Sequence, residues 1–218
     1  MKIRIEWHYH TPKGLNTVFQ SDEMTAGEAV VLAEDLTHTG RAKKLVLTDQ
    51  FDSTWTLKEL RGYVKGIETD PHNIMLSFDG GFDRGTGKAG LGCVIQYEQN
   101  GKFYRFRANR ALTQLSSNNE AEYAALHFAL EQAQELGVHD IPLTIFGDSR
   151  VVIQQMSGEW PVMEPDLAKW ADRIDARMES LGLHPEYHLV PRKENMEADR
   201  LATQSLNGVE VSATVELD

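Results

Sequence analysis

The sequence has a single cysteine, Cys93, in its 218 residues, and it contains no long run of apolar residues. One thiol excludes an intrachain disulfide, and its place in the apolar segment 92–95 predicts a buried structural thiol. Residues 1–10 alternate polar and apolar side chains and so lack the apolar core of a signal peptide, while no later run is long enough to span a bilayer. We therefore expect a cytoplasmic protein that does not bind a membrane.

Positive charge is also scarce, because 22 Lys and Arg stand against 33 Asp and Glu, a formal net charge of −11. Residues 1–70 have nine basic and eleven acidic residues, a net −2, and the remainder has thirteen and twenty-two, a net −9. A protein that holds nucleic acid mainly by bulk electrostatics needs the opposite balance. Any nucleic-acid binding must therefore rest on local basic groups, and bound metal ions would cancel only part of the acidic excess.

The polar segment 68–73, which contains a helix-breaking proline, separates two periodic regions and predicts a domain boundary. The length suits one full domain and one small one. We expect a small α+β domain at residues 1–70, a larger α/β domain at 73–206 and a loose C-terminal tail at 207–218.

In the first domain, Ile3, Ile5, Trp7 and Tyr9 alternate with polar residues and predict a strand, with a hairpin partner at 16–20. Thr25 and Glu28 have the spacing of a capping box at the start of a helix. Further strands are expected at 44–48 and 53–56, and a short helix at 57–66. This domain shows no catalytic constellation, and the pair His8 and His10 on one strand face is assigned no chemistry.

The second domain has three strand patterns in series, followed by helices that alternate with strands, which predicts a mixed sheet with helices packed on it. The expected strands are 74–78, 91–97, 102–107, 143–146 and 186–190, and the expected helices are 119–136, 149–156, 166–181 and 196–206.

Four carboxylates lie where these patterns expect apolar groups. Asp79 ends the apolar strand 74–78, and Asp148 follows the strand 143–146, so both are expected at the carboxyl ends of strands, where open α/β sheets place ligands. Glu122 and Asp199 share helix faces with apolar residues at offsets of three, four or seven. Burying an unpaired carboxylate in such a place lowers the free energy of unfolding by on the order of several kcal/mol.

Each acid taken alone could be a helix cap or the partner of a nearby arginine, such as Arg150 or Arg200. All four together favour a metal site. Carboxylate oxygens are hard ligands that suit Mg²⁺ or Mn²⁺, and no cluster of Cys or His supports zinc.

Four ordered motifs then resemble ribonuclease H type 1. They are FDGG at 78–81, SNNEAE at 117–122, GDS at 147–149 and ENMEAD at 194–199, and the turn GEW at 158–160 is also similar. The resemblance covers roughly residues 73–206, and residues 1–70 lie outside it. The segment 149–166 is short and acidic, as in the subgroup that lacks a basic protrusion.

The resemblance implies a five-stranded mixed sheet and hydrolysis of the RNA strand of RNA/DNA hybrids with two Mg²⁺ ions, for which Mn²⁺ could substitute. It implies that Asp79 bridges both ions, that Asp199 completes the site of the ion that activates water, and that Glu122 and Asp148 hold the other ion. It assigns substrate contacts to Gly80, Gly81, Asn118, Asn119 and Arg192, and the RNA strand is distinguished by its 2′-hydroxyls.

Three functions remain open on the sequence. The first is an active ribonuclease H, and the second is a weakly active or inactive nucleic-acid-binding or assembly protein that keeps the fold. The third is a related nuclease that acts on DNA or double-stranded RNA. The basic residues Lys102, Arg105, Arg107 and Arg110 could contact phosphates or could solubilise an edge strand. The protein partner of residues 1–70, if any, is unknown.

Overall fold

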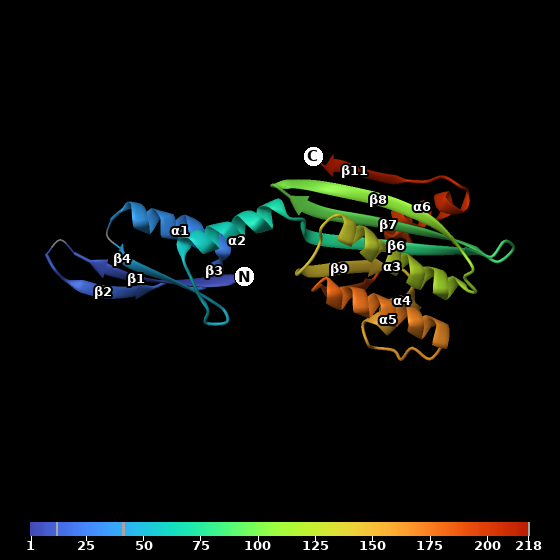
Figure 1. Ribbon diagram of the computed structural model, residues 1–218, viewed down its shortest axis with the longest axis horizontal. Coiled ribbons are helices and arrows are strands. Elements are labelled where there is room, and N and C mark those ends of the chain that lie inside the picture. The colour runs from blue at the N-terminus through green and yellow to red at the C-terminus, as the bar shows by residue number, and fades with distance from the viewer. Residues whose placement is uncertain (12, 41, 218) are drawn as a thin grey trace. The chain divides into compact units, whose positions relative to one another are not determined.

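The computed structural model describes residues 1–11, 13–40 and 42–217, and it divides the chain into two compact units, Met1–Thr69 and Asp70–Asp218 (Figure 1). The division falls inside the polar segment 68–73. Across the described ranges, no helix combines the length and the apolar character that crossing a membrane requires. The units are called unit 1 and unit 2 below.

Unit 1 is a sheet with strand order β2-β1-β4-β5, with β3 paired to the start of β1, and two helices. Its elements are β1 (Lys2–His10), β2 (Asn16–Gln20), β3 (Met24–Thr25), α1 (Ala26–His38), β4 (Ala42–Asp49), β5 (Thr54–Trp55) and α2 (Leu57–Thr69). The predicted capping box is confirmed, since Thr25 accepts from Glu28 N while the Glu28 carboxylate accepts from Thr25 N. Only the two-residue strand β3 was not predicted.

The alternation of β1 decides which face of this sheet is covered. Ile3 and Ile5 are fully buried, and they form a core with Leu47 of β4, Leu60 of α2 and small residues of α1. Both helices therefore cover the face that carries the odd-numbered residues of β1, and the even-numbered residues point to the other face.

Unit 2 is a six-stranded mixed sheet with strand order β10-β9-β6-β7-β8-β11. Its strands are β6 (His72–Asp83), β7 (Lys88–Gln99), β8 (Lys102–Thr113), β9 (Pro142–Gly147), β10 (His184–Leu189) and β11 (Ser212–Leu217). Its helices are α3 (Asn118–Glu135), α4 (Arg150–Met156), α5 (Pro165–Ser180), the 3-10 turn η1 (Arg192–Glu194) and α6 (Met196–Leu206).

The helices of unit 2 lie in two layers, with α3, α4 and α5 on one face of the sheet and α6 on the other (Figure 1). Glycines let both layers approach closely. A Cβ at Gly80 would lie 2.3 Å from the backbone of Ala121 in α3, and Cβ atoms at Gly90 and Gly92 would lie 2.1 and 2.2 Å from carbonyl oxygens of α6. Larger residues at these positions would push α3 and α6 off the sheet.

The structure differs from the sequence-based expectations at the C-terminal end of unit 2 and at the strand β8. Residues 207–218 were expected to be a loose tail, but Ser212–Leu217 forms β11, which pairs antiparallel with β8 and adds a sixth strand to the five expected. The segment was missed although its polar and apolar residues alternate, because its partner β8 lies about 110 residues earlier and no neighbouring segment offers a partner strand. The cationic strand β8 is consequently an inner strand, between β7 and β11, and not an edge.

Candidate active site

Asp79 lies within β6, not at its end as the sequence suggested, because the strand continues through Gly80 and Gly81 to Asp83. The parallel pairing of β6 with β9 stops at Ser77 and Phe146. Beyond that pair, β9 ends at Gly147 and is followed by Asp148, while β6 continues to pair with β7 on its other side. Asp79 and Asp148 therefore lie at the place where one neighbouring strand has ended, which leaves room beside the sheet for ligands.

The close approach of α3 to β6 brings Glu122 to the strand. With only hydrogen at Gly80, the first turns of α3 lie directly on β6, and Gly80 N donates a hydrogen bond of 3.2 Å to Glu122 Oε2. Gly80 is buried under this helix. Its small size thus serves helix packing, and Glu122, at 8% exposed, is directed inward as its helix face predicts.

The close approach of α6 to β7 places Asp199 in the same way. Ala198 and Ala202, which flank it on the helix, are buried over Gly92 and Gly90. Asp199 lies in the first turn of α6, where its backbone N–H donates to the carbonyl of Asn195 at 3.1 Å. Its side chain is 31% exposed, so it borders the site on the solvent side.

Asn195 is a site residue that the sequence reasoning did not assign. Its side chain is 2% exposed, and Nδ2 donates to the carbonyl oxygen of Phe78 at 2.9 Å and to Asp148 Oδ1 at 2.8 Å. It precedes α6 without capping it through its side chain. The only signal in the sequence was its place in the 194–199 motif, where an asparagine before a helix looks like an ordinary cap.

The four carboxylates repel one another. Burial, together with the charges of Asp148 and Asp199, raises the pKa of Asp79 to about 7. Burial, together with the charges of Asp79 and Asp148, raises the pKa of Glu122 to about 9, against a smaller opposing effect of the Gly80 hydrogen bond. The acids that the sequence singled out are thus within electrostatic reach of one another, drawn from β6, α3, the end of β9 and α6.

Arg192 provides the positive charge at this site. Its guanidinium donates to Asp199 Oδ1. Its positive charge opposes, but does not cancel, the rise in the pKa values of Asp79 and Glu122. The Arg192 side chain is 77% exposed, on the 3-10 turn that precedes α6. A phosphate oxygen from solvent can therefore reach this guanidinium and replace its carboxylate partner.

The remaining predicted substrate residues border the site. Asn118 is exposed and Asn119 half-buried in the first turn of α3, four and three residues before Glu122, so they lie on the same side of the helix as the carboxylate. Ser117 caps this helix by accepting from Glu120 N at 3.1 Å. Gly81 is half-buried next to Leu206 of α6.

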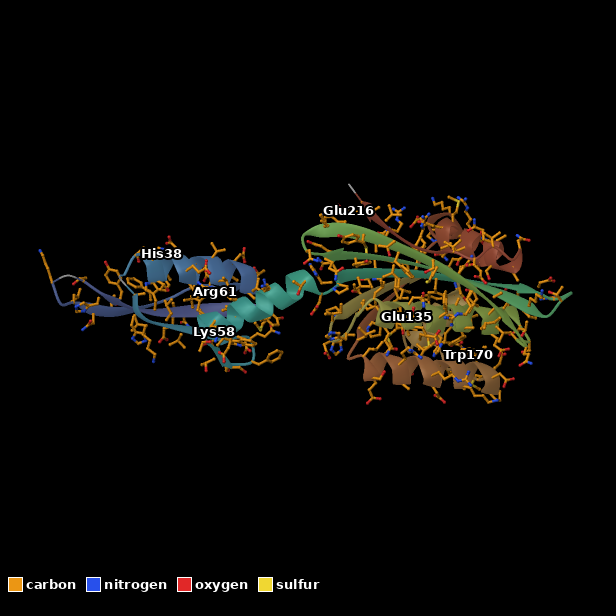
Figure 2. The ribbon with its side chains drawn as sticks, turned by 45° about the horizontal axis from the view of Figure 1, so that its top comes forward. His38, Lys58, Arg61, Glu135, Trp170 and Glu216 are labelled. Atoms are coloured by element: carbon orange, nitrogen blue, oxygen red, sulfur yellow. The ribbon has the colours of Figure 1, made fainter. Side chains whose placement is uncertain are left out.

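The cations of β8 are taken up by ion pairs. Lys102 bonds Glu216 of β11, labelled in Figure 2, at 2.9 Å, and Arg110 bonds Glu131 at 2.6 Å. Arg105 and Arg107 share Glu197 of α6 at 3.6 and 3.9 Å. These residues tie β8 to β11, α3 and α6, so their first role is structural.

No group of three or more His, Cys, Asp or Glu side chains in the described ranges has its donor atoms gathered as for a bound metal ion. The chemistry of the donor set nevertheless fits a hard divalent cation, because all four groups are carboxylates. Burial and the neighbouring acids raise the pKa values of Asp79 and Glu122, and a bound cation would favour their ionised forms.

Comparisons with known proteins agree with this architecture. The profile of the family described as reverse transcriptase-like matches residues 77–205. The uncharacterised protein YpeP of Bacillus subtilis is 41% identical over 208 residues, which cover 94% of this chain and 92% of that relative. Its similarity therefore includes much of unit 1.

Solved structures resemble unit 2. Ribonuclease HI of Halobacterium salinarum is 42% identical over 94 residues, 42% of this chain and 45% of that protein. The crystal structure of RNase H1 from Halobacterium salinarum aligns with this chain with a TM-score of 0.55 at 30% identity. The alignment covers 62% of this chain and 98% of that chain. LC11-RNase H1, isolated from compost and solved with an RNA/DNA hybrid, has a TM-score of 0.55 at 28% identity, with coverage of 62% and 98%.

The predicted fold class, a mixed sheet flanked by helices after a small α+β domain, is confirmed by the strand order of the sheet and by these structural neighbours. The family match spans more than half of the chain, and its boundaries enclose all four carboxylates. The chain therefore belongs to the reverse transcriptase-like family and, within it, is of the ribonuclease H type.

Proposed function

We propose that this protein is a metal-dependent endonuclease that hydrolyses the RNA strand of RNA/DNA hybrids. The observation that supports the proposal is the convergence of Asp79, Glu122, Asp148 and Asp199 from four separate elements, where burial and then mutual repulsion raise the pKa values of Asp79 and Glu122. Such a cluster is destabilising unless something bound there offsets the charge. The hybrid bound by the relative LC11-RNase H1 makes the same substrate the first choice here.

Asp79 interacts with both Asp148 and Asp199, so it is the residue best placed to be a ligand shared between two ions. Glu122 and Asp148 would hold one ion, and Asp199 would complete the site of the other. When bound, two divalent cations, Mg²⁺ or Mn²⁺, would supply the charge that stabilises the attacking and leaving oxygens of an in-line displacement at phosphorus.

The other residues position the substrate and the ligands. Asn195 holds Asp148 against the strand that carries Asp79, which fixes the carboxylate without adding charge. Arg192 is exposed enough to contact a phosphate oxygen after it leaves Asp199. Asn118 and Asn119 offer amide donors and acceptors, and Gly81 offers close backbone approach, at the border where a hybrid's minor groove and its 2′-hydroxyls would lie.

A second candidate is a nucleic-acid-binding or assembly protein with little or no turnover. It is favoured by the ion pairs that occupy Lys102, Arg105, Arg107 and Arg110, and by the net charge of −9 on residues 71–218. Both features reduce the positive surface available for phosphates.

A cleavage assay separates the candidates. Purified full-length protein is incubated with matched RNA/DNA hybrid, duplex DNA, duplex RNA and single strands, first with Mg²⁺ and then with Mn²⁺. We expect cleavage of the RNA strand of the hybrid alone. Binding without cleavage of any substrate would support the second candidate, and cleavage of duplex DNA or duplex RNA would show a related nuclease of different specificity.

A further inference from the structure

One end of unit 1 is basic and has no carboxylates of its own. This acid-free end comprises residues 7–21 and 36–48, which contain no Asp or Glu, while the acids of unit 1 lie at position 6 and within 22–35 and 49–68. In Figure 1 the last residues of β1 and α1 and the first residues of β2 and β4 lie at the same end of unit 1. The segments contain Lys13, Arg41, Lys43, Lys44, His8, His10 and His38.

The described cations of this end are free of ion pairs. Lys13 and Lys44 are exposed, and neither has a carboxylate partner within the described ranges. Glu6, which borders the acid-free end, contacts His8 at 3.1 Å. This is the opposite of β8 in unit 2, where each basic residue is neutralised by a glutamate.

The same end exposes an aromatic stack. Phe19 of β2 stacks on Trp7 of β1 with ring centroids 5.2 Å apart and 23° between the planes, and Tyr9 meets it edge-on at 5.9 Å. Trp7 packs in part against the core of unit 1, whereas Phe19 is 45% exposed. The rings therefore continue the buried side of the sheet past the part that the helices cover, and part of the Phe19 ring is open to solvent.

On the opposite face of the same strands lies a cavity of about 300 Å³, lined by His8, Tyr9, Asn16, Thr17, Val18 and Lys44. His8 pairs in register with both Val18 and Lys44, so these three side chains stand side by side on the helix-free face. Asn16, which meets His10 across the hairpin at 2.6 Å, contributes polar atoms to the lining. A cationic group, polar edges and an apolar floor thus surround one small hollow.

We propose that the acid-free end of unit 1 binds single-stranded nucleic acid that passes around the edge strand β2. Bases would stack on the exposed rings of one face, and phosphates would lie near Lys13 in the turn and near Lys44 on the other face. Proteins hold unpaired strands by combining exposed aromatic rings with free cations, because every base has a π-face and every linkage a charge. An acidic peptide would satisfy the lysines but would leave the stacked rings without a function. The site is separate from the carboxylates of unit 2, and it requires neither metal ions nor cleavage.

The test measures binding by full-length protein in EDTA, using fluorescence anisotropy of labelled uridine and thymidine homopolymers of about ten nucleotides. Phe19→Ala removes the exposed ring, and Lys44→Glu reverses an exposed charge. Phe51→Ala and Lys58→Glu are matched controls, because Phe51 is 77% exposed in the β4–β5 turn and Lys58, labelled in Figure 2, is exposed on α2, both outside the acid-free end.

We expect Phe19→Ala to weaken binding by roughly tenfold, since it removes the stacking of one base on the exposed ring. Lys44→Glu should weaken binding and reduce the slope of log affinity against log salt by about one, and both controls should bind as the wild type does. Equal effects of test and control variants would overturn the proposal. Heparin has charge but no bases, so heparin that binds as tightly as the oligonucleotides would also overturn the proposal. The proposal would fail as well if Phe19→Ala weakened binding to anionic lipid vesicles but not binding to the oligonucleotides.

Discussion

Asn195 Nδ2 donates a hydrogen bond of 2.8 Å to Asp148 Oδ1, although 47 residues separate the two in the chain. The same nitrogen donates to the carbonyl of Phe78, which directly precedes Asp79. One buried amide therefore connects the strand of Asp79, the carboxylate of Asp148 and the helix of Asp199. Since an amide adds no charge, it can fix these elements without competing with a metal ion.

We expect Asn195→Ala to lower both stability and metal affinity. The substitution leaves the Phe78 carbonyl buried without a donor, which costs about 1–3 kcal/mol, and it frees Asp148 to turn away from the site. Urea unfolding and a Mg²⁺ titration measure the two effects. Asn207→Ala is the control, because Asn207 donates to Thr203 O on the exposed end of the same helix. A control that loses as much stability and Mg²⁺ affinity as Asn195→Ala would contradict the role assigned to Asn195.

The raised pKa of Asp79 makes the metal-free protein lose stability as pH rises. Its carboxyl titrates near 4 when unfolded and at about 7 when folded, so folding takes up a proton between these values and the ionised form is disfavoured above them. Asp79→Asn cannot ionise. We expect it to melt above the wild type at pH 8 in EDTA, by several degrees, and to match it near pH 4.

Asp83→Asn, at the end of the same strand, should melt below the wild type at pH 8, in contrast to Asp79→Asn. Hydrogen bonds from the Thr86 hydroxyl and Gly85 N–H lower the pKa of Asp83, so its ionised form stabilises the folded protein above the unfolded pKa, and this contribution is lost as pH falls. Thermal melts of both variants from pH 4 to pH 8 check the signs. Asp79→Asn melting below the wild type at pH 8 would refute the repulsion described here.

Arg192→Gln should destabilise the metal-free protein and increase the stabilisation that Mg²⁺ provides. Without the guanidinium, Asp199 loses its partner and the carboxylates repel more strongly, so binding of Mg²⁺ relieves more repulsion and no longer has to displace Arg192. Lys193→Gln, at the neighbouring exposed cation, is the control. The measurement is the melting temperature with and without Mg²⁺, and an equal Mg²⁺ effect in wild type and Arg192→Gln would count against competition for Asp199.

Residues 70–218 expressed alone should fold and keep the metal site, because this unit has its own core and all four carboxylates. Circular dichroism and a Mg²⁺-dependent melting shift test the fragment. Insoluble protein, or a melting temperature that Mg²⁺ does not change, would show that unit 2 depends on unit 1.

The sequence sufficed for most elements because their periodicity is strong and each strand or helix has one apolar face. The same periodicity revealed the acids, because Glu122 and Asp199 are carboxylates that lie on the apolar faces of their helices. The strand β11 was missed because it is short and largely exposed and pairs with a segment about 110 residues earlier, which no local pattern indicates. Asn195 escaped because its role consists of two hydrogen bonds to distant residues, which no local pattern encodes.

The end of β6 was misplaced for a related reason. Glycines usually mark a turn, and so Gly80 and Gly81 were read as the end of the strand. In the structure they continue it, because their lack of side chains admits α3 and α6 rather than a change of direction. Close backbone approach and turn formation leave the same signature in one sequence, and only packing separates them.

The most direct test of the proposed function is cleavage of the RNA strand of a matched RNA/DNA hybrid in Mg²⁺ by the wild type, Asp79→Asn and Asp83→Asn under single-turnover conditions. We expect the wild type and Asp83→Asn to cut the RNA strand at similar rates, while Asp79→Asn stays folded and cuts none. Cleavage by Asp79→Asn at the wild-type rate would contradict the assignment of these carboxylates as the active site.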